Sequence, residues 1–177
     1  MLNELLNSGL ARELIVVVIS ILPVVELRGA LPIAMDVFHM PWYEAYLLSV
    51  IGNLLPVPFL LLFFDSVAKL VSRVQVGKRF VDWLLKRTRR QTGAVERYKH
   101  LGLIVFVAIP LPGTGAWTAS LVAYVLGLKF TRAFLDIAIG VIGAGIIVLA
   151  LVFMGWFGAL AAGIAVVVLA VLGLWKL

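Results

Sequence analysis

Residues 24–36 read VVELRGALPIAMD and place Glu26, Arg28 and Asp36 within a strongly apolar part of the chain. A second polar interruption, IPLPGTGAWTAS at residues 109–120, holds two prolines, two glycines and three hydroxyl side chains. Ionised groups and irregular backbone are costly in hydrocarbon unless protein or water surrounds them. We therefore predict that both stretches are tips of helical hairpins that enter a membrane and turn back at its middle.

The composition agrees with a membrane setting. The chain has 177 residues, of which 63% are hydrophobic and 14% charged, whereas a soluble domain has roughly 45–50% apolar and about 25% charged residues. A single membrane domain, 1–177, is expected. The chain has no cysteine and only two histidines, so disulfides and thiol-ligated metals are excluded and a histidine-based catalytic centre is disfavoured. We expect no enzyme activity, cofactor or metal.

The lengths of the apolar segments define the elements, because a helix needs about 20 apolar residues to cross the hydrocarbon. Three segments are long enough, at 42–64, 130–154 and 155–177. Four shorter arms flank the two tips, at 14–25, 30–40, 101–111 and 116–128. At 1.5 Å per residue these arms reach only the middle of a bilayer. The alternative is that 14–35 and 103–126 are ordinary spanning helices with kinks.

The two hairpins look like parts of an internal repeat. IVVVISILP, ending at Pro23, parallels IVFVAIPLP, ending at Pro112. The first repeat would cover 1–65 with its hairpin at 14–40, and the second 101–154 with its hairpin at 101–128. Since one full span lies between them, the hairpins must enter from opposite faces. The expected fold is therefore an all-α inverted repeat of two re-entrant hairpins with about three transmembrane helices, a layout common in secondary transporters.

Residues 66–100 connect the repeats and carry ten basic residues against two acidic ones. Apolar residues recur at helical spacing among them, which predicts an amphipathic helix on the cytoplasmic surface, facing anionic lipid headgroups rather than nucleic acid. The N-terminus is then outside, the C-terminus inside, and the protein is a multi-pass protein of the cytoplasmic membrane. Residues 1–13 are read as an interfacial amphipathic helix and not as a signal peptide. Five simple spans would instead put Lys129 and Arg132 outside.

The tips hold the candidate site. An arginine fork suits phosphate or carboxylate, and helix N-termini attract anions. The candidate residues for binding an anionic substrate are Glu26, Arg28, Gly29, Gly113, Thr114, Gly115, Trp117, Thr118 and Ser120. Pro32 is expected in the first turn of the arm after the first tip, and Thr114 is a candidate cap for the arm after the second. The alternative is that Glu26 and Arg28 only pair with each other and pin the hairpin.

Three carboxylates are candidates for proton coupling, namely Glu26, Asp36 and Asp136. For Asp136 the simpler alternative is an ion pair with Arg132, one turn earlier on the same helix. A homodimer is expected, because three spans and two half-depth hairpins have little bulk to seal a polar site. The glycine-rich faces of the last two spans suit close helix packing.

ELRGALP followed by PLPGTGAWTAS resembles the small multidrug export protein family of bacteria and archaea, over nearly the whole chain. The layout is similar to that of the DedA superfamily, in which two re-entrant hairpins face each other. This resemblance implies either drug efflux or the movement of polyprenyl-phosphate lipid carriers coupled to an ion gradient. DedA proteins carry two arginines in and near the second hairpin, which this chain lacks, so a role for Arg28 rests on its position alone.

The expected function is therefore a transporter or flippase of an anionic lipid, with polyprenyl phosphate as the example, and with binding where the hairpin tips meet. Two alternatives remain open. One is a small-molecule or multidrug exporter, which would need a larger aromatic-lined cavity and has less need of Arg28. The other is a membrane scaffold or assembly protein that transports nothing. An intramembrane phosphatase is disfavoured, since no His or Cys is placed to act as a nucleophile.

Overall fold

The computed structural model describes residues 9–71, 93–111 and 113–155 and a few positions beyond them. Within these ranges every regular element is helical, as predicted. The elements are α2 (Gly9–Ile21), α3 (Glu26–Pro32), the π-helical η1 (Ile33–Val37), α4 (Trp42–Leu54), α5 (Val57–Val71), α7 (Gly93–Ala108), α8 (Ala116–Val125) and α9 (Phe130–Phe153). Most of the predicted N-terminal amphipathic helix, the middle of the connector and most of the last span lie outside the described residues.

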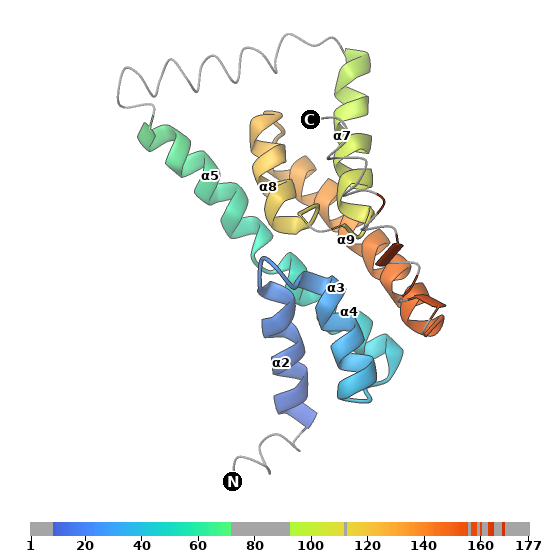
Figure 1. Cartoon of the computed structure of the whole chain (residues 1–177). Coiled ribbons are helices and arrows are strands. Elements are labelled where there is room, and N and C mark those ends of the chain that lie inside the picture. The colour runs from blue at the N-terminus through green and yellow to red at the C-terminus, as the bar shows by residue number, and fades with distance from the viewer. Residues whose placement is uncertain are drawn as a thin grey trace.

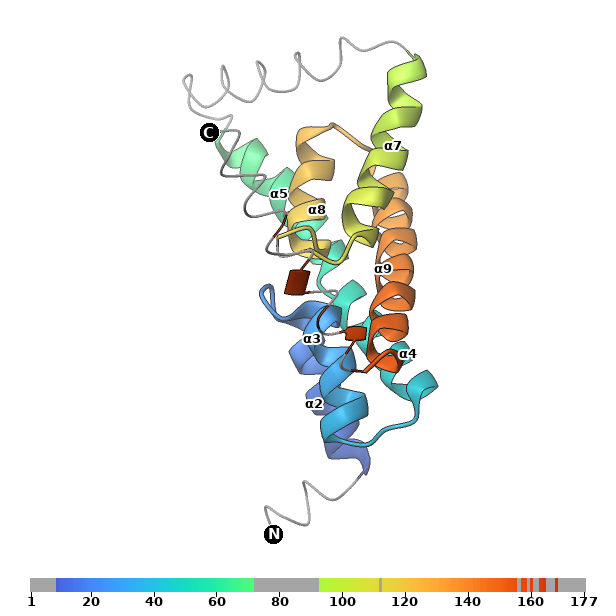
Figure 2. The ribbon, with the colours of Figure 1, turned by 45° about the vertical axis from the view of Figure 1, so that its right-hand side comes forward.

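The two hairpins approach each other from opposite ends of the molecule (Figure 1). Helix α2 runs to the middle, and α3 with η1 returns to the end from which α2 came. Helix α7 runs to the middle from the other end, and α8 returns there (Figure 2). Both views place the turn after α2 against the turn between α7 and α8. The predicted tips therefore meet.

The arms of both hairpins are too short to cross a bilayer. Helix α2 has 13 residues and α8 has 10, which correspond to about 20 Å and 15 Å, against about 30 Å of hydrocarbon. In the described part of the chain, the segments long and apolar enough to span are Trp42–Phe64 and Phe130–Phe153. These lengths are compatible with re-entrant hairpins, which remain a prediction.

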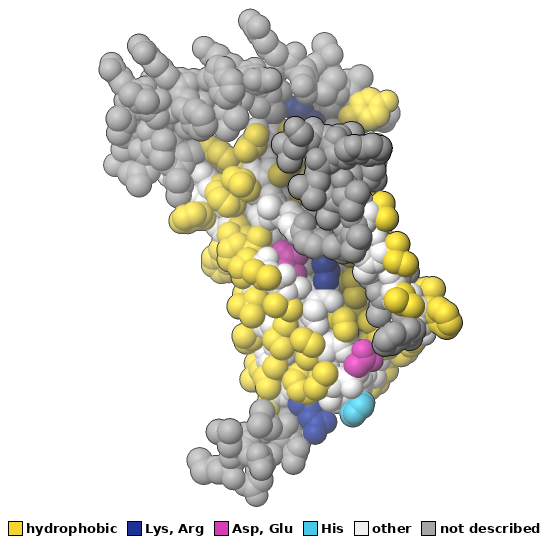
Figure 3. All heavy atoms as spheres, in the orientation of Figure 1, with side chains coloured by type: hydrophobic (Ala, Val, Ile, Leu, Met, Phe, Trp, Pro, Cys, Tyr) yellow, Lys and Arg dark blue, Asp and Glu magenta, His cyan; other side chains and the backbone are white. Residues whose placement is uncertain are grey.

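On the face that Figure 3 shows, hydrophobic side chains cover much of the described surface. Large side chains lie exposed along every long helix, among them Phe59 at 69% and Leu14 at 63% of their full accessibility. Only 39% of each spanning window is buried inside the protein, so these segments are not core helices of a soluble domain. Such a surface needs lipid around it, and the protein is a membrane protein.

The predicted span 42–64 is not one straight helix. Helix α4 ends at Leu54 and α5 begins at Val57, so two turn residues, Leu55 and Pro56, separate them. Proline has no N–H and clashes with the carbonyl four residues earlier, so Pro56 and Pro58 interrupt the helical ladder at this point. The segment Trp42–Phe64 is nevertheless long and apolar enough to span, as predicted. The interruption within it was not predicted.

A matching glycine contact joins the first arm to the spanning helix in each half. A Cβ on Gly52 of α4 would lie 2.7 Å from the Val17 carbonyl oxygen and 2.8 Å from Ser20 of α2. A Cβ on Gly140 of α9 would lie 2.9 Å from the Ile104 carbonyl oxygen and 2.5 Å from Val107 of α7. In both halves glycine therefore allows two helices to approach closely.

The second arm of the first hairpin begins earlier than predicted. Helix α3 begins at Glu26, not after the ELRG sequence, and Pro32 lies in its last turn. Pro32 cannot donate to the carbonyl of Arg28, and the wider π-helical turn η1 follows it directly. As a result, the charged residues of the tip belong to the first turn of a helix, whose N–H groups point toward the middle of the protein.

Candidate functional site

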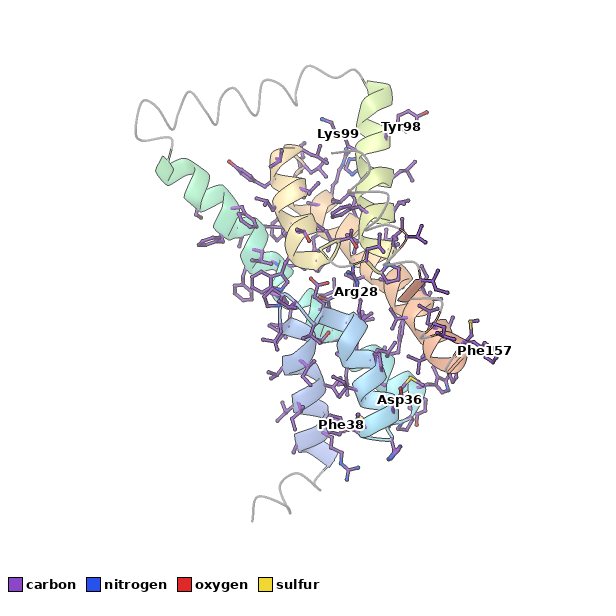
Figure 4. The ribbon with its side chains drawn as sticks, viewed as in Figure 1. Arg28, Asp36, Phe38, Tyr98, Lys99 and Phe157 are labelled. Carbon is purple, nitrogen blue, oxygen red and sulfur yellow. The ribbon has the colours of Figure 1, made fainter. Side chains whose placement is uncertain are left out.

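Arg28 connects the two hairpins at their tips. Its Nη2 donates a hydrogen bond of 2.9 Å to Oγ1 of Thr114, 86 residues further along the chain. Figure 4 places Arg28 at mid-height, between the end of the first hairpin and the turn that leads into α8. In the same orientation, Figure 3 shows a basic and an acidic side chain emerging there among apolar ones. The charge therefore lies where the tips of the two hairpins meet.

The carboxylate of Glu26 lies at the N-terminus of α8. A Cβ on Gly115 would fall only 1.6 Å from Oε2 and 2.1 Å from Oε1 of Glu26, so only glycine leaves room for this carboxylate. The carboxylate accepts a hydrogen bond from the backbone N–H of Trp117 and is attracted by Arg28. Glu26 is 5% exposed. It therefore provides the negative charge that the positive end of α8 attracts.

The backbone at Glu26 has an unusual conformation. Its φ is +50°, in the left-handed region that non-glycine residues rarely adopt. Such a conformation persists only where surrounding contacts over-determine it, and it is frequent at binding sites and switches. At Glu26 those contacts are Gly115 and Trp117, which belong to the other hairpin.

Trp117 makes the third link between the tips. Its indole Nε1 donates a hydrogen bond of 3.0 Å to the carbonyl oxygen of Ile21, the last residue of α2. The carbonyls of the last turn of a helix have no partner within the helix, so Trp117 satisfies one of them from the opposite hairpin. Trp117 was predicted only as one of the binding residues, and this role of its ring nitrogen was not predicted.

The other binding candidates differ in position. Gly113 is exposed, with a φ of +83° that favours glycine. Thr118 is exposed and donates to the carbonyl of Gly113 at 2.7 Å. Ser120 is fully buried, and its hydroxyl donates to the Ala116 carbonyl of its own helix. A Cβ on Gly29 would lie 2.3 Å from a methyl group of Val25, so its smallness serves local packing.

Thr114 is not the cap of α8 that the sequence suggested. Gly115 occupies the N-cap position, and Thr114 Oγ1 lies 2.8 Å from the carbonyl oxygen of Ile109 and 2.9 Å from that of Leu111. Thr114 thus ties the turn together and presents its oxygen to Arg28.

The carboxylates named for proton coupling do not gather at one place. Asp36 is exposed on η1, away from the tips, as Figure 4 shows. Asp136 is 8% exposed and pairs with Nδ1 of His100 across the packed helices α7 and α9. The partner of Asp136 is thus His100 on another helix rather than Arg132, which was the simpler alternative. His100 was not a candidate, because nothing in the sequence relates it to a residue 36 positions later.

The fold and the site together define a class, namely a polytopic membrane protein in which two half-length hairpins join through polar contacts inside an apolar body. Residues 26–147 match the family model described as "Putative small multi-drug export protein". This match covers more than half of the chain, so the chain belongs to that family, as the sequence motifs predicted. The matched range begins at Glu26 and includes Arg28, Thr114 and Trp117, whereas Ile21 precedes it. No curated protein and no solved structure shows a significant match to the chain.

Proposed function

We propose that this protein is a proton-coupled transporter of the cytoplasmic membrane that moves an amphiphile with an anionic headgroup. A lipid phosphate such as polyprenyl phosphate is the example that we favour. The observation that carries the proposal is the position of Arg28, which lies in an apolar body and reaches the opposite hairpin through Thr114. A guanidinium is always charged and offers several directed donors, so it suits an anionic group that has left water.

The arrangement of the hairpins supports a transport mechanism. We propose that they are re-entrant and form an inverted repeat, in which one repeat rocks against the other around a fixed site. The matched contacts of Gly52 and Gly140 support two equivalent halves. The bonds that join the halves at the tips involve four side chains, those of Glu26, Arg28, Thr114 and Trp117. A substrate that binds among them would change how firmly the halves are held together.

Glu26 offers a way to couple anion binding to protons. Its carboxylate already occupies the N-terminus of α8 and attracts Arg28. A substrate phosphate would need the same donors, and two anions side by side repel each other. Protonation of Glu26 removes this competing charge and leaves Arg28 and the helix end for the substrate. Proton binding and anion binding then strengthen each other by the same factor.

The family description favours a second candidate, an exporter of small drug-like molecules. A lipophilic cation would use the buried carboxylate of Glu26 as its counter-charge and would be repelled by Arg28. The two candidates therefore predict opposite effects of removing Arg28, namely loss of binding for an anionic amphiphile and unchanged or stronger binding for a cationic one.

The test is a binding titration of purified full-length protein in mild detergent with a fluorescent short-chain polyprenyl phosphate. We expect Arg28→Lys to bind several-fold more weakly than wild type, because lysine keeps the charge but loses the forked geometry. Arg28→Ala should lose binding by at least about 100-fold, on the order of 3 kcal/mol. Lys129→Ala, which removes an exposed cation near the end of the molecule, is the matched control and should bind like wild type. Equal affinity of folded Arg28→Ala and wild type would refute the proposal.

A further inference from the structure

A second polar cluster lies where α2 packs against α4. Ser20 and Ser49 are completely buried, and Asn53 is 4% exposed. The hydroxyl of Ser20 donates to the backbone carbonyl of Ser49. In contrast, Oγ of Ser49 and Oδ1 of Asn53 have no hydrogen-bond partner. Buried polar atoms are almost always satisfied, so two unpartnered oxygens four residues apart on one helix face require an explanation.

The backbone around this cluster adds further oxygens. Helices α2 and α4 both run toward the middle of the molecule and end there, at Ile21 and Leu54 (Figures 1 and 2). The C-terminal end of a helix carries partial negative charge and unpaired carbonyl groups. Pro56 and Pro58 have no N–H to give to the carbonyls of Gly52 and Leu54. The region therefore has acceptors in excess of donors, at the ends of two helices.

We propose that Ser49 Oγ and Asn53 Oδ1 form part of a binding site for a small monovalent cation, with Na⁺ as the ion of matching chemistry. Both groups are neutral oxygens. Divalent Ca²⁺ and Mg²⁺ sites in proteins are built on carboxylates, and the cluster contains none. Interrupted helices whose C-terminal ends face the membrane middle are a known way of holding Na⁺ in transporters.

The site has a structural consequence for the first hairpin. Ser20 precedes Ile21, whose carbonyl accepts the indole N–H of Trp117. The proposed ion would bind the face of α4 that contacts Ser20 through Gly52. The ion would thereby hold α2 against α4 at Ser20, which is next to the Ile21–Trp117 contact between the two tips. This role does not depend on which substrate binds at Arg28.

The experiment uses the purified full-length protein in detergent at constant ionic strength. Choline chloride is replaced stepwise by NaCl or KCl, the melting midpoint is followed, and ²³Na NMR line broadening reports binding directly. A ligand that binds only the folded state raises the midpoint with the logarithm of its concentration above Kd. We expect such a rise for NaCl, with a smaller one or none for KCl, and none for choline.

Variants assign the response to the cluster. Asn53→Leu keeps the branched outline of the side chain and removes the oxygen, and Ser49→Ala removes the hydroxyl with little change in shape. Each should reduce the Na⁺ affinity at least tenfold. Ser120→Ala, which removes a buried hydroxyl that back-bonds its own helix, should respond to Na⁺ like wild type. Arg28→Ala should also keep the Na⁺ response, which separates this site from the proposed anion site.

Two results would overturn the inference. In the first, wild type shows neither a Na⁺-dependent midpoint nor ²³Na broadening, which would mean that the cluster binds an ordered water only. In the second, Ser49→Ala and Asn53→Leu respond to Na⁺ as wild type does, which would place the ion elsewhere. If Asn53→Leu does not fold, Ser49→Ala and the wild-type titration still decide the question.

Discussion

Substitution of Gly115 by alanine tests the contact between the two tips. The backbone at Gly115 has a φ of −85°, which any residue can adopt. The effect of alanine must therefore come from its methyl group, which would lie 1.6 Å from Oε2 of Glu26. Real Cβ atoms essentially never approach another heavy atom closer than 3.0 Å, so the carboxylate must move by at least about 1.4 Å.

This displacement has a cost that can be worked out. It separates the carboxylate from the Trp117 N–H, and a hydrogen bond to a charged group contributes about 1.5–3 kcal/mol. It also removes a negative charge from the end of α8, where a partly buried one contributes up to about 2 kcal/mol. Because the two effects overlap, we expect a destabilisation of about 2–4 kcal/mol. For a chain of this length that lowers the melting midpoint by roughly 4–16 °C.

A double-mutant cycle assigns the effect to Glu26, with the midpoint and chemical unfolding in detergent as the readouts. With Glu26→Ala present, the methyl group of Gly115→Ala has room, and its cost should fall to about 1 kcal/mol or less. Gly102→Ala is the control, because a Cβ there meets nothing within 4 Å and should be neutral or stabilise α7 by up to about 1 kcal/mol. An equal cost of Gly115→Ala in both backgrounds would refute the contact that we describe.

Three further predictions concern the rest of the protein. His100→Gln and Asp136→Asn should each lower the free energy of unfolding by about 1–3 kcal/mol, because each leaves a poorly matched partner. The double variant should lose less than the sum of the two single losses. Additive losses would contradict the pair. Trp117→Phe should cost about 1 kcal/mol through the lost bond to Ile21, and an unchanged unfolding curve would mean that this bond contributes nothing. Single cysteines introduced at the two ends of this cysteine-free chain should react with an impermeant label on intact cells only at the N-terminus, and the opposite pattern would favour five simple spans.

Much of the arrangement was predictable because it depends on the distribution of polar groups along an apolar chain. The position of Arg28, the short arms and the meeting of the tips all follow from where charge and irregular backbone are tolerable in a membrane. The helix break near Pro56 could also have been predicted, because proline interrupts the hydrogen-bond ladder of a helix and Pro58 follows two positions later. It was not predicted. The pair His100–Asp136 and the contact of Glu26 with Gly115 were not readable, because both depend on the register of packed helices.

The conformation of Glu26 shows where local reasoning fails. Glutamate has no preference for a φ of +50°, so nothing in ELRGALP indicates that α3 begins at Glu26. The neighbouring hairpin imposes this conformation through Gly115 and the N–H of Trp117. A tertiary contact therefore fixes the helix start and turns the carboxylate toward α8 rather than toward solvent.

A coupling test distinguishes Glu26 from the titration of the ligand itself, since phosphate monoesters change charge near pH 6. The affinity of short-chain polyprenyl phosphate is measured from pH 5.5 to 8 for wild type and for Glu26→Gln. At each pH the ratio of the wild-type affinity to the variant affinity cancels the effect of ligand titration, because both proteins bind the same ligand. We expect the variant to bind more tightly at high pH and the two proteins to converge as the pH falls, since protonated Glu26 resembles glutamine. A ratio that does not change with pH would show that Glu26 is not coupled to the anion.

The most direct test of the central claim is lipid movement in proteoliposomes. Short-chain polyprenyl phosphate is placed in the inner leaflet, a pH gradient is applied, and its arrival outside is detected with an added phosphatase. Wild type should expose the lipid well above protein-free vesicles, Arg28→Lys should do so much more slowly, and Arg28→Ala should remain at the background. If correctly inserted, folded Arg28→Ala moved the lipid as fast as wild type, the meeting point of the hairpin tips would not be the substrate site.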